Sequence, residues 1–267
     1  MPHPAIKTRV EDHILFVTIA RPEKRNALLP EMIDAISAAV RGADDDPQVR
    51  AVIVHGEGPM FSAGIDISAL GGMLGAAEGR NPARLLRRLA DRLQDGLNTL
   101  EATELPVIGA LHGAVMGLGL ELALAFDLRV ASTDCQLSIP EARVGLVADV
   151  GGTTRLARTI GPSRAKDMLM TARNVPAEEA LAWGLVNRVV PAEEVLSTAI
   201  ALAGEIMQNA PLAVGLAKLI VDQGDGVSKA TQMAIERWAQ SQLITTEDVG
   251  EAFMAFIEKR PPKFQGK

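Results

Sequence analysis

Short apolar runs alternate with amphipathic segments over roughly the first 160 residues of the chain. The runs are rich in β-branched residues and are bounded by charged residues, glycine or proline, a pattern typical of strands buried on both faces. Buried strands are predicted over residues 14–19, 51–54, 106–111 and 128–132. Between them, apolar residues recur at helical spacing, which predicts helices over residues 30–43, 81–103 and 117–126. Strands that alternate with helices predict βαβ units and a mainly parallel α/β core.

The pattern changes near Gly161 and Pro162, and from Ser163 onward we expect helices throughout, interrupted by prolines. Two domains are therefore predicted. Residues 1–161 would form an α/β core that holds the functional site, and residues 162–267 would form a helical region.

Composition excludes several classes of function. The net charge of −6 argues against nucleic-acid binding, which usually rests on clustered Lys and Arg. The single cysteine, Cys135, allows no intrachain disulfide, and the four histidines lack metal-ligand spacing, so no metal is expected. Residues 1–10 contain no apolar run typical of a signal sequence, and no stretch approaches the ~20 apolar residues of a membrane span. We expect a cytoplasmic protein that binds neither nucleic acid nor membrane.

The first loop with candidate chemistry is the segment Phe61–Asp66, which follows a predicted strand and a Gly/Pro turn. Its small residues let a ligand approach the backbone closely, and a helix that begins near Asp66 could be capped by that residue. The unpaired N–H groups of a helix start can bind an anionic oxygen. The alternative interpretation is an ordinary tight turn between a strand and a helix.

The second loop joins a predicted strand to an apolar helix over residues 112–121. Gly117 and Gly119 could hold an irregular turn whose N–H groups point outward, and Glu121 follows in the first helical turn. An acid near the positive end of a helix dipole is common and modestly stabilising. This helix is apolar nearly all round, however, which predicts that it is buried, and a buried glutamate requires a reason.

A third segment places Glu141 and Asp149 in apolar, turn-rich surroundings. Glu141 could be a surface acid that follows a proline, and Asp149 could cap a helix that begins near Gly151. Together with Glu121, the two acids make a proton-transfer site plausible. Spacing alone does not name a reaction.

The chain resembles the enoyl-CoA hydratase/isomerase (crotonase) family over about residues 10–265. The matching motifs, in chain order, are RPxxxNAL at 21–28, FSAGxD at 61–66, ELALxxD at 121–127, PE at 140–141, GGTxRL at 151–156, ALAWGLVNRVV at 180–190 and FIEKRP at 256–261. The resemblance implies a crotonase-like spiral of ββα units with a C-terminal helical trimerisation region, assembled as a homotrimer or a dimer of trimers. It also implies an acyl-CoA thioester as substrate, without a separate cofactor because coenzyme A is part of the substrate.

The resemblance also implies roles for individual residues. The backbone N–H groups of Ile65 and Leu118 match the oxyanion hole that binds the thioester oxygen, and such donors are worth a few kcal/mol each. Leu118 stands where a third glycine is common, which should leave its N–H available but narrow the pocket. Glu121 and Glu141 match the two glutamates of the hydratases, which hold one water between them. One accepts the water's proton while the other protonates C2, since close carboxylates separate their pKa values.

Asp149 departs from the hydratase pattern, where glycine is common. The ADVG element at 148–151 resembles the dienoyl-CoA isomerases of the family, which keep the acid matching Glu141 but carry Asp in place of Glu121. We therefore expect an enoyl-CoA hydratase acting on a trans-2-enoyl-CoA, with a 3,5-2,4-dienoyl-CoA isomerase that uses Glu141 and Asp149 as the alternative. A non-catalytic acyl-CoA-binding protein is a third possibility. Retention of both glutamates argues against it, because burying acids is costly.

Coenzyme A would be bound by residues from both ends of the chain. Lys24 and Arg25 are the early cations suited to phosphates, although they could also be solvated loop charges. The resemblance implies that Arg25 and the tail residues approach the nucleotide and pantetheine, and that the tail could come from a neighbouring subunit. The predicted CoA-binding set is Lys24, Arg25, Ala63, Gly64, Asp66, Phe256 and Lys259.

Overall fold

Two β-sheets organise the chain. The structure is a computed structural model that describes residues 3–75, 81–224 and 226–267. The main sheet has the order β1-β2-β3-β4-β6-β9, with β1 antiparallel to β2 and the other pairs parallel. Its strands are β1 (Ile6–Glu11), β2 (Ile14–Ile19), β3 (Ala51–Gly56), β4 (Val107–Leu111), β6 (Leu128–Ser132) and β9 (Arg188–Val190). The smaller sheet contains β5 (Ala114–Met116), β7 (Gln136–Ser138) and β8 (Val175–Pro176).

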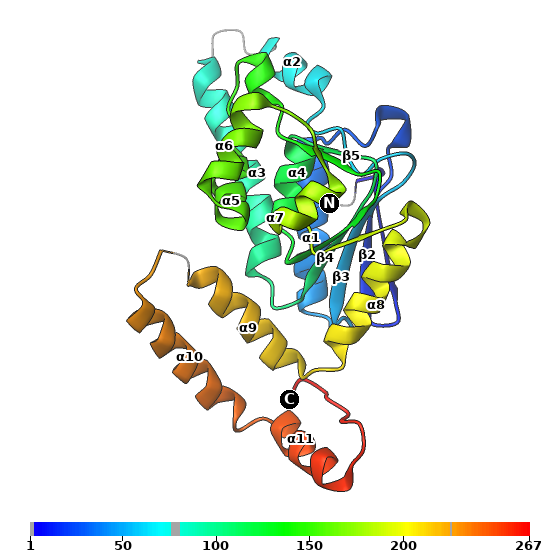
Figure 1. The fold of residues 1–267 in the computed structure, drawn as a ribbon, viewed down its shortest axis with the longest axis vertical. Coiled ribbons are helices and arrows are strands. Elements are labelled where there is room, and N and C mark those ends of the chain that lie inside the picture. Colours follow the sequence, from blue (N-terminus) through cyan, green and yellow to red (C-terminus); the bar gives the residue numbers. More distant parts are fainter. Residues whose placement is uncertain (1–2, 76–80, 225) are drawn as a thin grey trace.

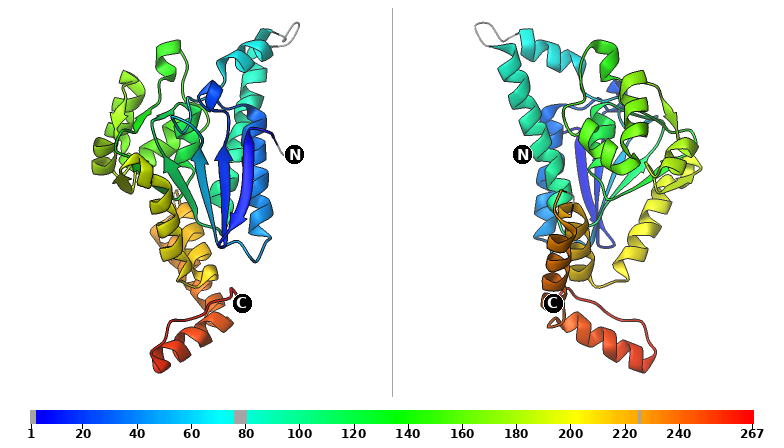
Figure 2. Two further views of the ribbon diagram at one scale, coloured as in Figure 1. Left: turned by 90° about the vertical axis from the view of Figure 1, so that its right-hand side faces the viewer. Right: turned by 60° about the vertical axis from the view of Figure 1, so that its left-hand side comes forward.

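Helices cover both faces of the main sheet (Figures 1 and 2). In strand β2, Val17 and Ile19 belong to the large core beneath α1 (Pro30–Asp44), α3 (Pro82–Ala102) and α4 (Leu118–Leu124). Ile14 and Phe16 of the same strand pack in a second core with α8 (Val195–Met207). Because successive side chains point to opposite faces, a strand with two covered faces is apolar throughout, as the sequence predicted.

Four short helices lie in the upper half of the molecule in Figure 1, and one of them, α7, packs against the smaller sheet. These helices are α2 (Ile67–Gly75), α5 (Gly152–Ile160), α6 (Pro162–Thr171) and α7 (Ala177–Trp183). Three 3₁₀ turns complete the described elements: η1 (Pro22–Lys24), η2 (Glu141–Val144) and η3 (Ala192–Glu194). The architecture matches the predicted crotonase-like α/β fold with helices at the C-terminal end.

The expectation that the chain is helical throughout after Ser163 is wrong. Strand β8 pairs with β7, and β9 is the sixth strand of the main sheet through its pairing with β6. These strands are only two and three residues long, so their apolar pattern is too short to recognise in the sequence. The division into residues 1–161 and 162–267 stays a prediction; β9 and α8 complete the sheet layers from beyond the expected boundary.

Three C-terminal helices form an arm that projects from the sheet layers (Figure 1). They are α9 (Pro211–Gln223), α10 (Lys229–Leu243) and α11 (Glu247–Glu258). Lys218 of α9 fixes the arm to the core. Its Nζ lies 3.0 Å from Asp127 Oδ2 and donates to the carbonyls of Leu100 and Leu105 at 2.8 and 3.0 Å. A buried cation with three acceptors is well satisfied, so the base of the arm is held firmly.

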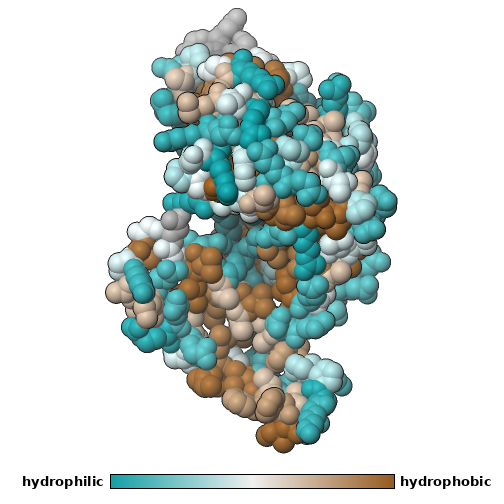
Figure 3. All heavy atoms as spheres, viewed as in Figure 1, coloured by the Kyte–Doolittle hydropathy of each residue, from teal (hydrophilic) through white to brown (hydrophobic). Residues whose placement is uncertain are grey.

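Large apolar side chains are exposed on the arm, and Figure 3 shows brown surface along it. They include Trp238, Phe253, Phe256 and Ile257, of which Phe256 is 84% exposed. An exposed apolar patch of this kind marks an interaction surface.

Within the described residues, no single helix has the length and hydropathy to cross a membrane. The segments 192–207 and 211–223 are long and apolar enough when taken together, but the chain bends by 107° between them.

Candidate active site

The two candidate loops lie against each other. Ser62 donates its N–H to the Ala114 carbonyl at 3.1 Å, and Met116 donates back to the Ser62 carbonyl at 3.0 Å. On its other side, the first loop is held by Leu28, whose N–H donates to the Gly64 carbonyl at 2.7 Å. These backbone bonds place the segments 61–66 and 114–118 side by side.

The two predicted oxyanion donors therefore occupy adjoining loops. Gly64 has φ +93°, and a Cβ added to it would lie 2.8 Å from the Met116 carbonyl oxygen and 3.6 Å from the Leu118 nitrogen. Leu118 is the first residue of α4, where a helical N–H has no partner in its own helix. Among the described residues, neither the Ile65 N–H nor the Leu118 N–H has a hydrogen-bond acceptor. Both are free to bind a ligand oxygen.

Asp66 caps helix α2, as the sequence suggested. Its Oδ1 accepts from the N–H groups of Ser68 and Ala69 at 3.0 and 3.2 Å, and its Oδ2 accepts from Arg21 at 2.7 Å. Hydrogen bonds from the Ser68 hydroxyl and from Arg21 hold the pKa of Asp66 well below its usual range. The carboxylate is thus engaged within the chain, and a contact between Asp66 and coenzyme A stays a prediction.

The predicted CoA-binding residues from the two ends of the chain lie in two separate places. Lys24 and Arg25 are exposed at the end of η1, and among the described residues neither side chain has an acidic partner. The Arg25 carbonyl accepts from the N–H of Ala63 at 3.0 Å, so both cations lie beside the first loop. Phe256 and Lys259 belong to the end of α11, in the arm, far from α2 and the loops (Figure 1). The chain does not by itself bring these two groups together.

Glu121 is buried and held by a turn from another part of the chain. Only 3% of the residue is exposed, and its Oε1 accepts from the N–H groups of Val150 and Gly152 at 2.9 and 2.8 Å. Burial raises the pKa of Glu121 to about 7, and the nearby Glu141 charge adds to the increase, while the two N–H groups oppose it. A carboxyl group with this pKa can give up and take up a proton near neutral pH.

Glu141 lies against the turn that presents the Leu118 N–H. A Cβ added to Gly117 would come 2.6 Å from Glu141 Oε1, and Oε2 is buried without a hydrogen-bond partner among the described residues. Burial, followed by the charge of Asp149, raises the pKa of Glu141. A buried polar atom normally has a partner, so Oε2 is suited to contact a water or substrate.

Asp149 does not cap helix α5, which was the alternative interpretation of its position. The N-cap residue of α5 is Gly151, which has no side chain that could accept a hydrogen bond. The N–H of Gly152, the first residue of the helix, donates instead to Glu121 Oε1. Asp149 is exposed, and only partial desolvation raises its pKa; its charge raises the pKa values of Glu121 and Glu141. The structure thus brings the three predicted acids within electrostatic reach of one another.

Sequence reasoning missed the partners of these acids. The GGTxRL motif contains Gly152 and the nearby Arg155, but its pattern gave no sign that the turn binds Glu121.

Cys135 is buried, and burial raises the pKa of its thiol to about 12, so the thiol is unreactive near neutral pH. The described residues contain no cluster of three or more His, Cys, Asp or Glu side chains arranged to hold a metal ion.

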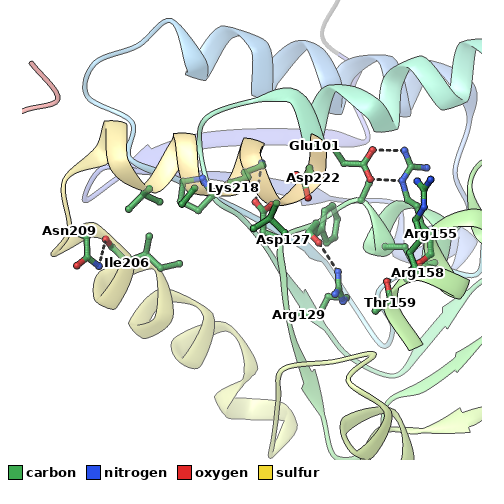
Figure 4. Close-up of a pocket in the computed structure, with 17 residues that line it drawn as sticks. Glu101, Asp127, Arg129, Arg155, Arg158, Thr159, Ile206, Asn209, Lys218 and Asp222 are labelled. Carbon is green, nitrogen blue, oxygen red and sulfur yellow. Dashed lines mark hydrogen bonds and ion pairs between the residues drawn. The ribbon is translucent and has the colours of Figure 1, made fainter. Parts of the chain in front are cut away.

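A separate cavity of about 990 Å³ lies between the base of α9 and the core (Figure 4). It is lined by paired charges, including Asp127 with Lys218 and Glu101 with Arg155. Burial, with the nearby Asp127 charge, raises the pKa of Asp222 in this cavity to about 6. None of the predicted site residues lines it, so it is distinct from the site at Glu121.

The sequence profile of the enoyl-CoA hydratase/isomerase family matches residues 9–267. The chain is 38% identical to the short-chain-enoyl-CoA hydratase of Clostridium acetobutylicum, over 94% of this chain and 93% of that protein. It is 36% identical to the crotonyl-CoA hydratase of Syntrophomonas wolfei, over 96% of each protein. In structure it is similar to an enoyl-CoA hydratase from Bacillus anthracis, with a TM-score of 0.90 and 31% identity over 98% of this chain and all of that one. The chain therefore belongs to the enoyl-CoA hydratase/isomerase family.

Proposed function

We propose that the protein is an enoyl-CoA hydratase that adds water across the 2,3 double bond of a trans-2-enoyl-CoA thioester. The observation that carries the proposal is a pair of glutamates, the buried Glu121 and the half-buried Glu141 with its buried Oε2, beside two loops with free N–H groups. Membership of the family and the hydratase names of its relatives support the same reaction.

In the proposed mechanism, the N–H groups of Ile65 and Leu118 bind the thioester oxygen and stabilise the negative charge that develops on it. This polarisation makes C3 electrophilic. The water oxygen then bonds to C3, one glutamate takes the water's proton, and the other glutamate gives a proton to C2. One preorganised backbone donor typically contributes about 2.7–4 kcal/mol to such a transition state.

We assign Glu121 as the base and Glu141 as the acid. Glu121 Oε1 accepts two N–H groups, which favour its charged form, whereas Glu141 Oε2 has no donor among the described residues. Both pKa values are raised, that of Glu121 to about 7, so the pair can hold one shared proton near neutral pH. In the proposed mechanism this proton lies on Glu141 when the water is activated, and Glu141 delivers it to C2.

Turnover on a panel of 2-enoyl-CoA thioesters of increasing length tests the proposal. We expect loss of the conjugated thioester absorbance with formation of 3-hydroxyacyl-CoA. Short substrates should react fastest, because the relatives noted above are named for short-chain and crotonyl thioesters. If a folded sample forms no hydrated product at any chain length, the proposal is wrong.

Asp149 supports a second candidate, isomerisation of a 3,5-dienoyl-CoA, in which Asp149 and Glu141 would exchange protons with opposite ends of the conjugated chain. The third carboxyl group in electrostatic contact with the pair is the specific observation in its favour.

Asp149→Asn separates the two reactions. Since Asp149 makes no cap to α5, the amide should leave the fold intact. For a hydratase we expect a rate within about threefold of the wild type, because water activation requires only the glutamates. A dienoyl-CoA isomerase would lose about 10²-fold or more, the usual effect of removing a proton-transfer group. Rates on 2-enoyl- and 3,5-dienoyl-CoA, measured for both proteins, distinguish these outcomes.

We further propose that the protein assembles as a trimer or a dimer of trimers. A neighbouring subunit would bury the apolar side chains that the arm exposes to solvent. In such an assembly, Phe256 and Lys259 of one chain could reach Lys24 and Arg25 of another. Light scattering coupled to gel filtration should give a mass three or six times that of the 28.3 kDa chain. A monomer at micromolar concentration would contradict this assembly.

A cytoplasmic location is part of the same proposal. Neither the acidic net charge of −6 nor the acyl-CoA chemistry calls for a nucleic-acid or membrane partner.

A further inference from the structure

Two side chains hold carbonyl groups of the turn 149–152, the same turn whose N–H groups bind the buried carboxylate. Gln94 of α3 donates its amide N–H to the Asp149 carbonyl at 2.5 Å. Arg155 Nη1 donates to the Val150 carbonyl at 3.0 Å. The turn is therefore fixed through its carbonyl groups as well as through its N–H groups.

Arg155 is itself locked in one orientation. Its Nε and Nη2 both donate to the Glu101 carboxylate at 2.7 Å, as the dashed lines of Figure 4 show, and Nη2 also donates to Asn98 Oδ1 at 2.6 Å. A two-pronged contact of this kind fixes the plane of the guanidinium group. The α3 residues Gln94, Asn98 and Glu101 recur at helical spacing, so one face of α3 supplies the whole anchor.

We propose that Arg155 is a positioning residue, which aims the N–H groups of the turn 149–152 at Glu121. The inference rests on the proposed function, in which Glu121 is the base. By holding the Val150 carbonyl, Arg155 fixes the peptide that joins Val150 to Gly151. This peptide lies between the two peptides whose N–H groups bind Glu121, and Gln94 holds the carbonyl of the first of them. Fixing the middle peptide limits how far the N–H groups of Val150 and Gly152 can turn, and so where the carboxylate lies.

The anchor matters because the surroundings of Glu121 oppose its charged form. The titratable groups whose charges act on it are Glu141 of η2 and Asp149 of the turn, both negative, and the residue is buried. The two N–H groups are the interactions that favour the charged form. If they lose their alignment, the ionised form is less stabilised and Glu121 becomes a base only at higher pH.

Arg155→Met tests the inference, because it removes every donor while keeping an unbranched chain. We expect kcat for hydration to fall about 10- to 100-fold, the range for a misplaced catalytic group, with KM changed less than about threefold. The acid limb of the kcat–pH profile should move up by about 0.5 to 1 pH unit. Arg155→Lys, which can still reach one acceptor, should recover part of the loss. Arg164→Met removes an exposed arginine of α6 and should match the wild type.

A titration of the resting enzyme separates this inference from the proposed function. Carbon-13 NMR of labelled glutamate, with the Glu121 signal assigned by its loss in Glu121→Gln, should show a higher titration midpoint in Arg155→Met. If the wild type hydrates and neither the midpoint nor kcat changes, Arg155 is only structural and the inference is wrong. If the wild type shows no hydration but the midpoint moves, the positioning role stands and the proposed function fails.

Glu101→Gln provides the same test if Arg155→Met folds poorly. It removes the charged partner of the guanidinium without emptying any space, and it should shift the midpoint and the acid limb in the same direction by a smaller amount. An unchanged midpoint in a folded Glu101→Gln protein would also contradict the inference.

Discussion

Replacing Glu121 with glutamine is expected to lower kcat for hydration by about 10²- to 10⁴-fold, the range for removing a general base. Glutamine keeps the length of the side chain, and its carbonyl oxygen can still accept from the N–H groups of Val150 and Gly152. It cannot take a proton from water. The measurement is a pre-steady-state and steady-state assay on a 2-enoyl-CoA, with Glu178→Gln on the exposed side of α7 as the control.

The Glu121→Gln variant should become more stable relative to the wild type as the pH rises. The pKa of Glu121 in the folded protein is raised to about 7 from the ordinary value of 4.5, so ionisation favours the unfolded chain. The stability from protonated Glu121 is complete below about pH 4.5 and is lost as the pH rises through about 7. Glutamine does not ionise, so the Tm difference between variant and wild type should become more positive from about pH 5 to pH 8. A Tm difference that is independent of pH, together with undiminished turnover, would rule out Glu121 as the buried base.

Replacing Gly64 with alanine is expected to lower kcat by about 10²-fold or more, because it separates the two loops that hold the oxyanion donors. The added methyl group would lie 2.8 Å from the Met116 carbonyl oxygen, too close for a carbon atom, and that oxygen is backbone. The loops would have to move apart, and the Ile65 and Leu118 N–H groups could no longer bind one oxygen. Loss of a single such donor typically costs about 10²- to 10³-fold in kcat.

Gly184→Ala is the matched control for backbone strain. Gly184 has φ +78°, similar to the φ of +93° at Gly64, but an added Cβ there meets nothing within 4 Å. Both variants should lose a similar part of their thermal stability from the left-handed backbone. Only Gly64→Ala should lose turnover, and it should also bind a non-reactive acyl-CoA thioester more weakly. Equal effects of the two substitutions on turnover would mean that strain, and not the donor geometry, limits the reaction.

Much of the fold could be predicted because its strands are covered on both faces. The runs at 14–19, 51–54, 106–111 and 128–132 became β2, β3, β4 and β6 with boundaries within two residues. Long amphipathic helices were equally clear, and the predicted helix at 81–103 is α3 (Pro82–Ala102). In both cases many residues repeat one pattern, so the local signal is strong.

The shorter strands were missed for a physical reason. Strands β5, β7 and β9 have three residues each, too few for a period to be recognised, and they form only when a distant strand supplies the hydrogen bonds. Strand β1 was missed because it lies at the sheet edge and most of its residues are exposed, so it lacks the apolar run of the central strands.

Periodicity and motifs are local properties, and they were enough to predict the two-sided α/β layers, the family and the residue types of the site. Which of these groups meet depends on how distant segments pack. The N–H groups that hold Glu121 come from residues 29 and 31 positions away along the chain, and Glu121, not Asp149, accepts the first N–H of helix α5. Hydrogen bonds between such distant segments leave no periodic trace in the sequence, because they depend on the packing of α3, α4 and α5 around the turn.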